Sequence, residues 1–420
     1  MKPIDPALAA RSAALKLLGA ALGGRGGLES PLADLSLARL SPQDRAFARA
    51  LTMATLRRLG PIDRALDARL QREPPPPVRD LLRLGLAQAF YLDTPAFAAV
   101  DTTVALAPKS LSGLVNAVLR GQLREGPPSK DPEALAPAWL FARWRAAWGD
   151  AGARAIAGAI AEEPAGDLSP RGAPEPALVE ALEAEILPGG TLRTRRRGDI
   201  SAWPGFDAGA WWVQDAAAAI PARLLAVQQG ETVLDLCAAP GGKTFQLADA
   251  GAAVTALDRA APRLRRLAES LARLNLAAEV VEADLRSWTD KRLFDAVLLD
   301  APCSATGTFR RHPDVLWNTR PSDIGTLAMA QARLLGEAAA RVRPGGRLVY
   351  SVCSLEREEG EDQVRGFLAA FGAFTLDPIA PGEGGSPPAS LAPEGWLRIL
   401  PHHLAGGLDG FFIARFRRRS

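Results

Sequence analysis

The sequence predicts a multidomain protein with an all-α region at its N-terminus and a doubly wound α/β region at its C-terminus. The chain has 420 residues, enough for two or three domains of about 100–200 residues each. Apolar residues recur at helical spacing from about residue 5 to residue 123, and buried-strand runs alternate with helical segments beyond residue 211. With 48% apolar residues, the chain is neither mainly disordered nor fibrous.

Capping signals delimit helices in the first region. Ser41 precedes Pro42 and Asp44, which is typical of an N-cap followed by proline and an acid in the first turn. Gly60-Pro61 is expected to end that helix. We therefore predict a compact domain of several short helices over residues 1–126. Periodicity alone also allows this domain to be a simple packing module.

Residues 127–204 are predicted to form a linker followed by a small α/β subdomain. Residues 126–132 are rich in glycine and proline, as linkers often are. Tryptophans 139, 144 and 148 follow at helical spacing, which favours a buried helix face over a base-stacking surface. Arginines 193 and 195–197 form a cluster, which is either a solvated face or a phosphate contact.

The α/β region is predicted over residues 205–420. Its strand runs are residues 232–236, 253–257, 279–281, 294–299, 347–350 and 411–414. Helical segments such as 261–275 and 323–342 lie between them. This alternation is typical of a largely parallel sheet.

Charge and cysteine content limit the functional classes. The chain has 50 basic and 47 acidic residues, so no overall basic field indicates nucleic acid. Only six of the basic residues are lysines, which indicates compositional bias with some use of arginine for phosphate. Cys237, Cys303 and Cys353 show no C-x-x-C spacing, which disfavours disulfides and structural zinc. We expect a reduced, cytoplasmic enzyme with no metal, no signal peptide and no membrane span.

A loop of small residues follows the first predicted strand of the α/β region and precedes a predicted helix. The loop consists of Cys237, Ala238, Ala239, Pro240, Gly241, Gly242 and Lys243. Ligands bind at this position in doubly wound sheets, because small residues let the backbone approach a cofactor and the helix N-terminus supplies donors. Asp258, sixteen residues after Gly242, ends the next strand, where an acid can hold ribose hydroxyls. The spacing is not G-x-G-x-x-G, which disfavours a nicotinamide cofactor.

Two further aspartates are predicted at the same edge of the sheet. Asp284 ends the third strand and Asp300 the fourth. Together with Asp258 they place three carboxylates beside the glycine loop. The alternative is that all three only cap turns.

The cysteines also lie at predicted strand ends. Cys303 follows Asp300-Ala301-Pro302, and Cys353 follows Tyr350-Ser351-Val352. A lone cysteine at such a place is more often a small buried hydrophobe. Two of them, each followed by a serine, favour thiol chemistry.

The block from Leu236 to Leu355 closely resembles the RNA cytosine-5 methyltransferases of the Sun/Fmu family (RsmB-like, Nop2-related). Through Asp44-Arg45-Ala46-Phe47 and residues 114–120, the N-terminal helices resemble the NusB-like RNA-binding domain of bacterial members. The resemblance implies a NusB-like domain, a small RNA-binding subdomain, and a Rossmann-like S-adenosylmethionine-dependent methyltransferase domain with a mostly parallel seven-stranded sheet.

The resemblance also implies roles for single residues. Residues 237–243 would form the S-adenosyl-L-methionine loop, Asp258 would bind the ribose hydroxyls, and Asp284 would lie by the adenine. Asp300 would lie between the cofactor and the target base. Cys353 would be the nucleophile.

Cys303 is implied to assist product release. The chain departs from the family pattern at three places. Ala305 replaces the usual glycine, Val352 replaces the usual threonine, and Pro170-Arg171-Gly172 stands where many relatives have Arg-x-Asn.

Cytosine methylation explains the need for such groups. Carbon 5 of cytosine is a poor nucleophile, and a thiolate added at carbon 6 turns the ring into an enamine that attacks the sulfonium methyl. Asp300 can stabilise charge on the ring nitrogen, and a base must then remove the carbon-5 proton. The target cytosine must leave its stack to expose carbon 6, so the enzyme must bind unpaired RNA. The arginines at 195–197, 310–311 and 417–419 are candidate contacts to the RNA phosphates.

We interpret the chain as a cytoplasmic, monomeric methyltransferase that uses S-adenosyl-L-methionine to modify carbon 5 of a cytosine in 16S ribosomal RNA. One alternative has transfer RNA as the substrate. A second is a non-catalytic RNA-binding assembly factor. A third is a DNA cytosine-5 enzyme in which Cys303 is the nucleophile.

Overall fold

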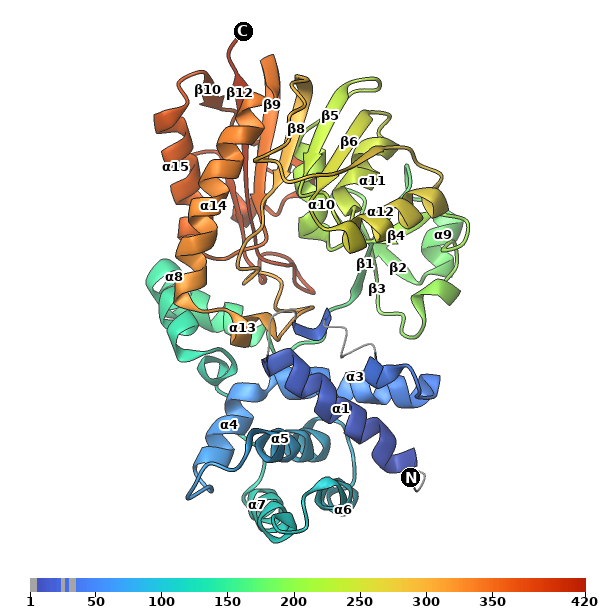
Figure 1. Cartoon of the computed structure of the whole chain (residues 1–420), viewed down its shortest axis with the longest axis vertical. Coiled ribbons are helices and arrows are strands. Elements are labelled where there is room, and N and C mark those ends of the chain that lie inside the picture. The colour runs from blue at the N-terminus through green and yellow to red at the C-terminus, as the bar shows by residue number, and fades with distance from the viewer. Residues whose placement is uncertain (1–5, 24–26, 30–34) are drawn as a thin grey trace. The chain divides into compact units, whose positions relative to one another are not determined.

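The computed structural model describes residues 6–23, 27–29 and 35–420 of the chain (Figure 1). Residue 5, where the predicted helical region begins, lies outside the described residues. The chain forms two compact units. The helical unit comprises Met1–Glu163 with Phe309–Asn318, and the α/β unit comprises Pro164–Thr308 with Thr319–Ser420.

The helical unit is built from short helices. They include α1 (Pro6–Gly23), α3 (Pro42–Arg57), α4 (Leu59–Asp67), α5 (Pro76–Tyr91), α6 (Ala96–Leu106), α7 (Ser112–Glu125), α8 (Ala138–Gly158) and α13 (Val315–Asn318), with 3-10 turns η1 (Gly27–Glu29) and η2 (Pro132–Leu135). Leu18, Leu51 and Leu82 belong to its shared core and are fully buried. The predicted all-α N-terminal fold is therefore confirmed.

The start of α3 follows the capping signal. Ser41 is the N-cap, and its hydroxyl accepts a hydrogen bond from the backbone nitrogen of Asp44 at 3.1 Å. The break expected at Gly60-Pro61 comes earlier, at Arg58, and Pro61 lies in the first turn of α4. Proline is tolerated there because a first-turn nitrogen has no helical acceptor to lose.

The helical unit extends beyond the predicted boundary at residue 126. Residues 127–163 were predicted to begin the linker and the α/β subdomain, yet they pack with the helices. The turn η2 contacts α4, and Leu140 and Trp144 of α8 are fully buried. The predicted core position is thus confirmed for Trp144, whereas Trp139 and Trp148 are only partly buried.

The segment Phe309–Asn318, from the second half of the sequence, also belongs to the helical unit. Phe309 is fully buried, and its ring centroid lies 5.9 Å from that of Trp144. Arg57 donates a hydrogen bond to the carbonyl oxygen of Arg310 at 2.6 Å. These contacts join residues far apart in the sequence, so no local pattern predicts them.

The α/β unit begins with a small antiparallel sheet. Its strands are β1 (Gly166–Pro170), β2 (Ala184–Ile186), β3 (Leu192–Thr194) and β4 (Trp211–Val213), in the order β2-β3-β1-β4, with α9 (Pro176–Ala181) between β1 and β2 in the chain. Arg193 forms a buried ion pair with Asp167 across β3 and β1, with 2.7 Å between nitrogen and oxygen. Arg193 therefore holds the small sheet together and is not a phosphate contact.

The large sheet has the order β10-β12-β9-β8-β5-β6-β7, with β11 paired to β12. Its strands are β5 (Thr232–Leu236), β6 (Ala253–Asp258), β7 (Glu279–Glu282), β8 (Phe294–Asp300), β9 (Val342–Val352), β10 (Phe374–Leu376), β11 (Leu397–Ile399) and β12 (Phe411–Arg418). Strands β5 to β9 are parallel, and β12 is antiparallel to β9. This confirms the predicted α/β fold with a mostly parallel sheet.

Alternate residues of the strands face two different helix layers. Besides α9, the α-helices of this unit are α10 (Ala216–Leu224), α11 (Gly242–Asp249), α12 (Ala261–Leu274), α14 (Pro321–Ala340) and α15 (Glu361–Ala370) (Figure 1). Leu234 and Leu299 pack with α14 and α15, whereas Val233 and Leu298 pack with α10. Successive side chains of a strand point to opposite faces of the sheet, and helices cover both faces. Each buried strand is therefore apolar throughout. No helix within the described residues is long and apolar enough to span a membrane.

We predict that Phe309→Ala destabilises the helical unit, because it removes a fully buried ring from the contact with Trp144. The free energy of unfolding should fall by about 3–5 kcal/mol, measured by urea denaturation followed by tryptophan fluorescence. Phe97→Ala is the matched control, since Phe97 is 71% exposed, and should change stability by less than about 0.5 kcal/mol. Equal effects of the two substitutions would contradict the placement of Phe309.

Candidate functional site

The predicted site residues meet at one edge of the large sheet because of the strand order. Strands β9, β8, β5 and β6 are consecutive neighbours and run in parallel, so their carboxyl ends lie side by side. In this register Asp300 pairs with Ser351, and Leu236 pairs with both Leu257 and Leu299. The glycine loop, Asp258, Asp300 and both later cysteines therefore follow adjacent strand ends, as predicted for a doubly wound sheet.

The glycine loop makes a tight turn from β5 into α11. Gly241 is the N-cap of α11 with φ of 113°, a conformation that favours glycine. A Cβ atom at Gly241 would lie 2.4 Å from the ring of Phe245, so no side chain fits. The loop residue Cys237 also has a positive φ, of 57°. The backbone geometry thus explains why small residues stand in this loop.

Asp258 holds the glycine loop against the end of β6. Its carboxylate accepts hydrogen bonds from the backbone nitrogens of Ala239 at 3.1 Å and Ala260 at 2.9 Å. Asp258 is 5% exposed. Each oxygen keeps acceptor capacity beyond its one backbone bond, so the predicted ribose contact is compatible with this second role.

A cluster of carboxylates lies around Cys237. Asp235 of β5 is almost fully buried, and burial raises its pKa to about 7. One of its oxygens accepts from the hydroxyl of Thr244 at 2.6 Å, and the other has no hydrogen-bond partner among the described residues. Burial, followed by the charges of Asp258, Asp300 and Asp235, raises the pKa of the Cys237 thiol to about 12. Burial and the surrounding carboxylates therefore disfavour a thiolate at Cys237.

Lys243 is the cation that contacts this cluster directly. Its Nζ lies 2.7 Å from Oδ2 of Asp300, and Oδ1 of Asp300 accepts from the hydroxyl of Ser351 at 2.8 Å. Of the three carboxylates, Asp300 is the one that Lys243 contacts directly. A ligand with a positively charged sulfonium fits this excess of negative charge and the close backbone of the glycine loop.

Asp284 lies apart from the buried carboxylates. Strand β7 ends at Glu282, so Asp284 follows the strand and does not end it. Hydrogen bonds from the side chain and the backbone of Arg286 lower the pKa of Asp284 to about 2. The preceding residue, Ala283, donates its backbone N–H to the carbonyl oxygen of Asp258 at 3.0 Å. Asp284 is thus the next residue after one that is hydrogen-bonded to Asp258, the predicted ribose acid. It is more exposed than Asp258.

The two later cysteines form a pair. Their Sγ atoms are 3.4 Å apart, although Cys303 follows β8 and Cys353 follows β9. The hydrogen bond to Cys353, followed by burial, raises the pKa of the Cys303 thiol well above its ordinary value. Cys303 therefore holds its proton more strongly than an ordinary thiol, and either sulfur can be the donor of the hydrogen bond between them.

Glu359 is a site residue that sequence analysis missed. Its carboxylate is fully buried and accepts hydrogen bonds from the backbone nitrogen of Ser304 at 2.9 Å and from Nε2 of Gln331 at 3.0 Å. It also accepts from the hydroxyls of Ser304 and Ser354. These serines directly follow the two cysteines. Glu359 therefore ties the two thiol loops to one buried charge.

One departure from the family pattern has a structural correlate. Ala305 has a φ of 56°, in the left-handed region that glycine adopts without strain. This explains why glycine is usual at that place. Its backbone oxygen accepts from the backbone nitrogen of Thr308 at 2.9 Å, which closes the turn after Cys303.

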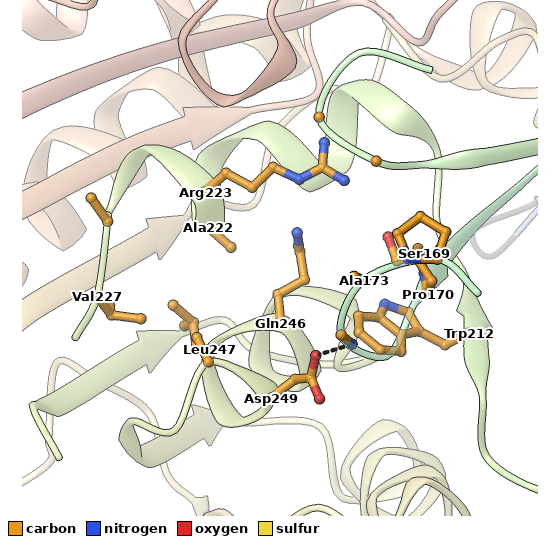
Figure 2. A pocket seen from close by; sticks show the side chains of 16 residues that line it. Ser169, Pro170, Ala173, Trp212, Ala222, Arg223, Val227, Gln246, Leu247 and Asp249 are labelled. Carbon is orange, nitrogen blue, oxygen red and sulfur yellow. Dashed lines mark hydrogen bonds between the residues drawn. The ribbon is translucent and has the colours of Figure 1, made fainter. Parts of the chain in front are cut away.

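Pro170 and Gly172, which belong to the departure at Pro170-Arg171-Gly172, line a cavity of about 590 Å³ in the α/β unit (Figure 2). Asp249, at the end of α11, accepts from the backbone nitrogen of Gly172 at 2.7 Å, shown as a dashed line in Figure 2. Arg223 lies on the opposite wall and donates to the hydroxyl of Thr191 at 2.8 Å. The cavity lies at the end of α11 that Asp249 forms, whereas the glycine loop lies at the other end of this helix. Neither the glycine loop nor the thiol pair lines the cavity.

The arginines that were predicted to contact phosphate differ in how exposed their side chains are. Arg195 and Arg197 are exposed, as a phosphate contact requires. Arg310 is 3% exposed and lies inside the helical unit, so the prediction of phosphate contact is wrong for this residue. Its burial follows from the packing of Phe309–Asn318 with the helices.

Comparison with known proteins matches both units to families. The family described as 16S rRNA methyltransferase RsmB/F matches residues 222–417, and the NusB family matches residues 8–124. A ribosomal RNA small subunit methyltransferase B of Pseudomonas syringae pv. tomato is 37% identical, covering 96% of each chain. Its counterpart in Xanthomonas campestris pv. campestris is 38% identical, covering 98% of each chain.

Solved structures show the same fold. The crystal structure of PH0851 covers 99% of each chain with a TM-score of 0.79 and 24% identity, a likeness of fold alone. A methyltransferase homolog from Pyrococcus horikoshii is 28% identical with a TM-score of 0.56, covering 74% of this chain and 100% of its own. The predicted family resemblance is thereby confirmed over nearly the full length. The chain belongs to the 16S rRNA methyltransferase RsmB/F family, with a NusB-family helical region, and is an RNA methyltransferase that uses S-adenosyl-L-methionine.

Proposed function

We propose that this protein transfers a methyl group to carbon 5 of a cytosine in 16S ribosomal RNA, through a covalent bond between Cys353 and carbon 6. The observation that carries the proposal is the pair of thiols 3.4 Å apart beside Asp300. The names of the relatives support ribosomal RNA as the substrate. S-adenosyl-L-methionine supplies the methyl group, and residues 237–243, Asp258 and Asp284 are proposed to hold it.

Cys353 is the proposed nucleophile because a thiolate is disfavoured at its partner, Cys303. The hydrogen bond to Cys353 and burial raise the pKa of the Cys303 thiol, and either sulfur can be the donor in the pair. Addition of the Cys353 thiolate forms the bond to carbon 6 and moves an electron pair toward the ring nitrogen. The enamine so formed makes carbon 5 nucleophilic.

Asp300 and Lys243 are proposed to stabilise that charge. The ion pair between them holds both side chains at the strand edge. A carboxylate fixed by Ser351 can accept from the amino group of cytosine, while the adjacent ammonium can donate to the ring nitrogen. The ring is then bound most tightly when its negative charge develops.

Cys303 is proposed to act in release of the product. After methylation, carbon 5 carries both a proton and the methyl group. A water molecule takes that proton, the electron pair left behind forms the double bond between carbons 5 and 6, and the bond between carbon 6 and Cys353 breaks with its electron pair on sulfur. The Cys303 sulfur lies beside the sulfur that must leave. A DNA cytosine-5 enzyme would use the cysteine of the Pro-Cys dipeptide, here Cys303, as its nucleophile.

The substrate is tested by bisulfite mapping of ribosomal and transfer RNA from cells with and without the gene. One cytosine in 16S ribosomal RNA should lose its protection from deamination when the gene is absent. Loss at a transfer RNA cytosine would move the substrate to transfer RNA. No change in either RNA would support a non-catalytic assembly factor.

We predict that the two thiol variants differ in kind. Cys353→Ala should form no covalent adduct with RNA, because no enamine forms without addition. Cys303→Ala should accumulate a protein–RNA adduct, because elimination stalls after methyl transfer. Denaturing gels after incubation with RNA and S-adenosyl-L-methionine distinguish them, and the reverse pattern would assign the nucleophile to Cys303.

We predict that Asp258→Ala weakens binding of S-adenosyl-L-methionine at least tenfold, measured by calorimetry. Charge-assisted hydrogen bonds contribute roughly 1.5–3 kcal/mol each, and the substitution also releases the backbone of Ala239. Asp290→Ala is the matched control, because Asp290 pairs with Arg292 on the surface. Unchanged affinity in a folded Asp258→Ala variant would remove this residue from the site.

We predict that Glu359→Gln lowers kcat at least tenfold while the affinity for S-adenosyl-L-methionine stays within about twofold. The amide presents a donor where Ser304 and Ser354 need an acceptor, so the two thiol loops lose their alignment. Glu358→Gln serves as the control on the same turn. A proportional loss of cofactor binding and kcat would indicate general unfolding and contradict a positioning role.

A further inference from the structure

A cavity of about 400 Å³ in the helical unit takes no part in the proposed chemistry. Helix α3, the end of α5 and residues 161–163 form its walls. Its lining includes Arg49, Met53, Arg57, Arg58, Tyr91 and Glu163. We propose that this cavity binds one unpaired nucleotide of the RNA substrate, with Arg49 and Arg58 at its phosphate and Tyr91 at its base. The proposal rests on the proposed function, because it assigns a second contact to the same RNA.

Arg58 is the main reason for expecting an anion. Its guanidinium lies 5.2 Å from the ring centroid of Tyr91, and its Nη1 atom is buried without a hydrogen-bond partner among the described residues. Burial lowers the pKa of Arg58, and the neighbouring Tyr91 opposes that shift. Arg58 is partly exposed and lines the cavity, so the accessible part of its guanidinium can meet a phosphodiester oxygen there, and Arg suits such oxygens because its donors form a planar fork.

The helix beside the cavity is locally basic in a chain of nearly balanced charge. From Pro42 to Arg58 there are four arginines and one acid, Asp44, whose carboxylate accepts from the hydroxyl of Ser41. Arg49 is exposed and stands four residues before Met53, so both lie on the helix face that lines the cavity. Phosphate contacts from such a face give sequence-independent affinity.

Arg57 forms the floor of the cavity and is not a ligand. It is 6% exposed, and its guanidinium already donates to the carbonyl oxygens of Ile160 at 3.2 Å and Arg310 at 2.6 Å. Burial lowers its pKa to about 10, and the charge of Glu163 opposes that shift. The Glu163 carboxylate reduces the net positive charge, which favours a singly charged phosphodiester over a multiply charged free phosphate.

The remaining walls suit a base. Tyr91 is partly exposed beside the partly exposed apolar side chains of Met53 and Leu92. Unpaired bases commonly stack on aromatic rings and on arginine planes. The volume lies in the range of about 300–1,000 Å³ that is usual for small-ligand sites.

The test measures binding of the full-length protein to a single-stranded RNA oligonucleotide and to 16S ribosomal RNA at several salt concentrations. Arg58→Ala and Arg49→Ala should each weaken binding about threefold to tenfold. Each should also lower the magnitude of the salt slope by about 0.7, the value for one phosphate contact on a single strand. Arg58→Lys should recover the salt slope more than the affinity, because it keeps the charge and loses the fork.

Arg120→Ala is the matched control, since Arg120 is an exposed arginine on α7 that bonds only to Asn116 in the described contacts. It should leave affinity and salt slope unchanged. Affinity for S-adenosyl-L-methionine should be the same in every variant. Arg49 is on the surface, so its variant tests the cavity even where Arg58→Ala does not fold.

Two outcomes would overturn the proposal. One is an RNA affinity and salt slope that match the wild type in folded Arg49→Ala and Arg58→Ala. The other is a thermal shift by inorganic phosphate or adenosine monophosphate that Arg58→Ala abolishes while RNA binding stays unchanged, which would make the cavity a small-molecule site. If the wild type methylates no cytosine yet both variants bind RNA more weakly, the proposed function fails and the cavity assignment stands.

Discussion

The buried carboxylate of Glu359 is the interaction on which the arrangement of the two thiols depends. Cys303 and Cys353 are 50 residues apart in the sequence and end different strands. Parallel pairing of β8 with β9 brings their backbones together, but the serines after the cysteines are held by Glu359. A fully buried carboxylate needs several donors, and the two loops supply them. The same hydrogen bonds therefore stabilise the buried Glu359 carboxylate and align the two sulfur atoms.

Charge in the neighbouring cofactor region is arranged differently. There Asp235, Asp258 and Asp300 lie around Cys237, and Lys243 contacts Asp300. The orphaned oxygen of Asp235 and its raised pKa show that the negative charge is not fully compensated within the protein. A cationic cofactor would relieve this, which links affinity for S-adenosyl-L-methionine to the electrostatics of the strand ends.

The chain itself connects the thiol site with the helical unit. Six residues after Cys303 it enters the segment Phe309–Asn318, which packs among the helices. Arg57 holds this segment through the carbonyl oxygen of Arg310, and the same side chain forms the floor of the cavity beside Arg58. In our proposals, the helical unit contacts RNA, and a short stretch of chain joins this unit to the turn that carries Cys303. The helical region is more than a packing module in this interpretation.

The sequence alone determined the features that depend on local patterns: the strand runs, the loop at 237–243, the N-cap Ser41 and the aspartates and cysteines at strand ends. These follow from periodicity, from capping chemistry and from the rule that parallel strands end at one edge. Tertiary structure alone decided which acids of the run 356–362 are buried, namely Glu356, Glu359 and Glu361. Glu359, for example, meets its donors only when α14 and both thiol loops are packed. Tertiary structure also decided that Phe309–Asn318 belongs with the helices, because packing between distant segments leaves no periodic signal in either of them.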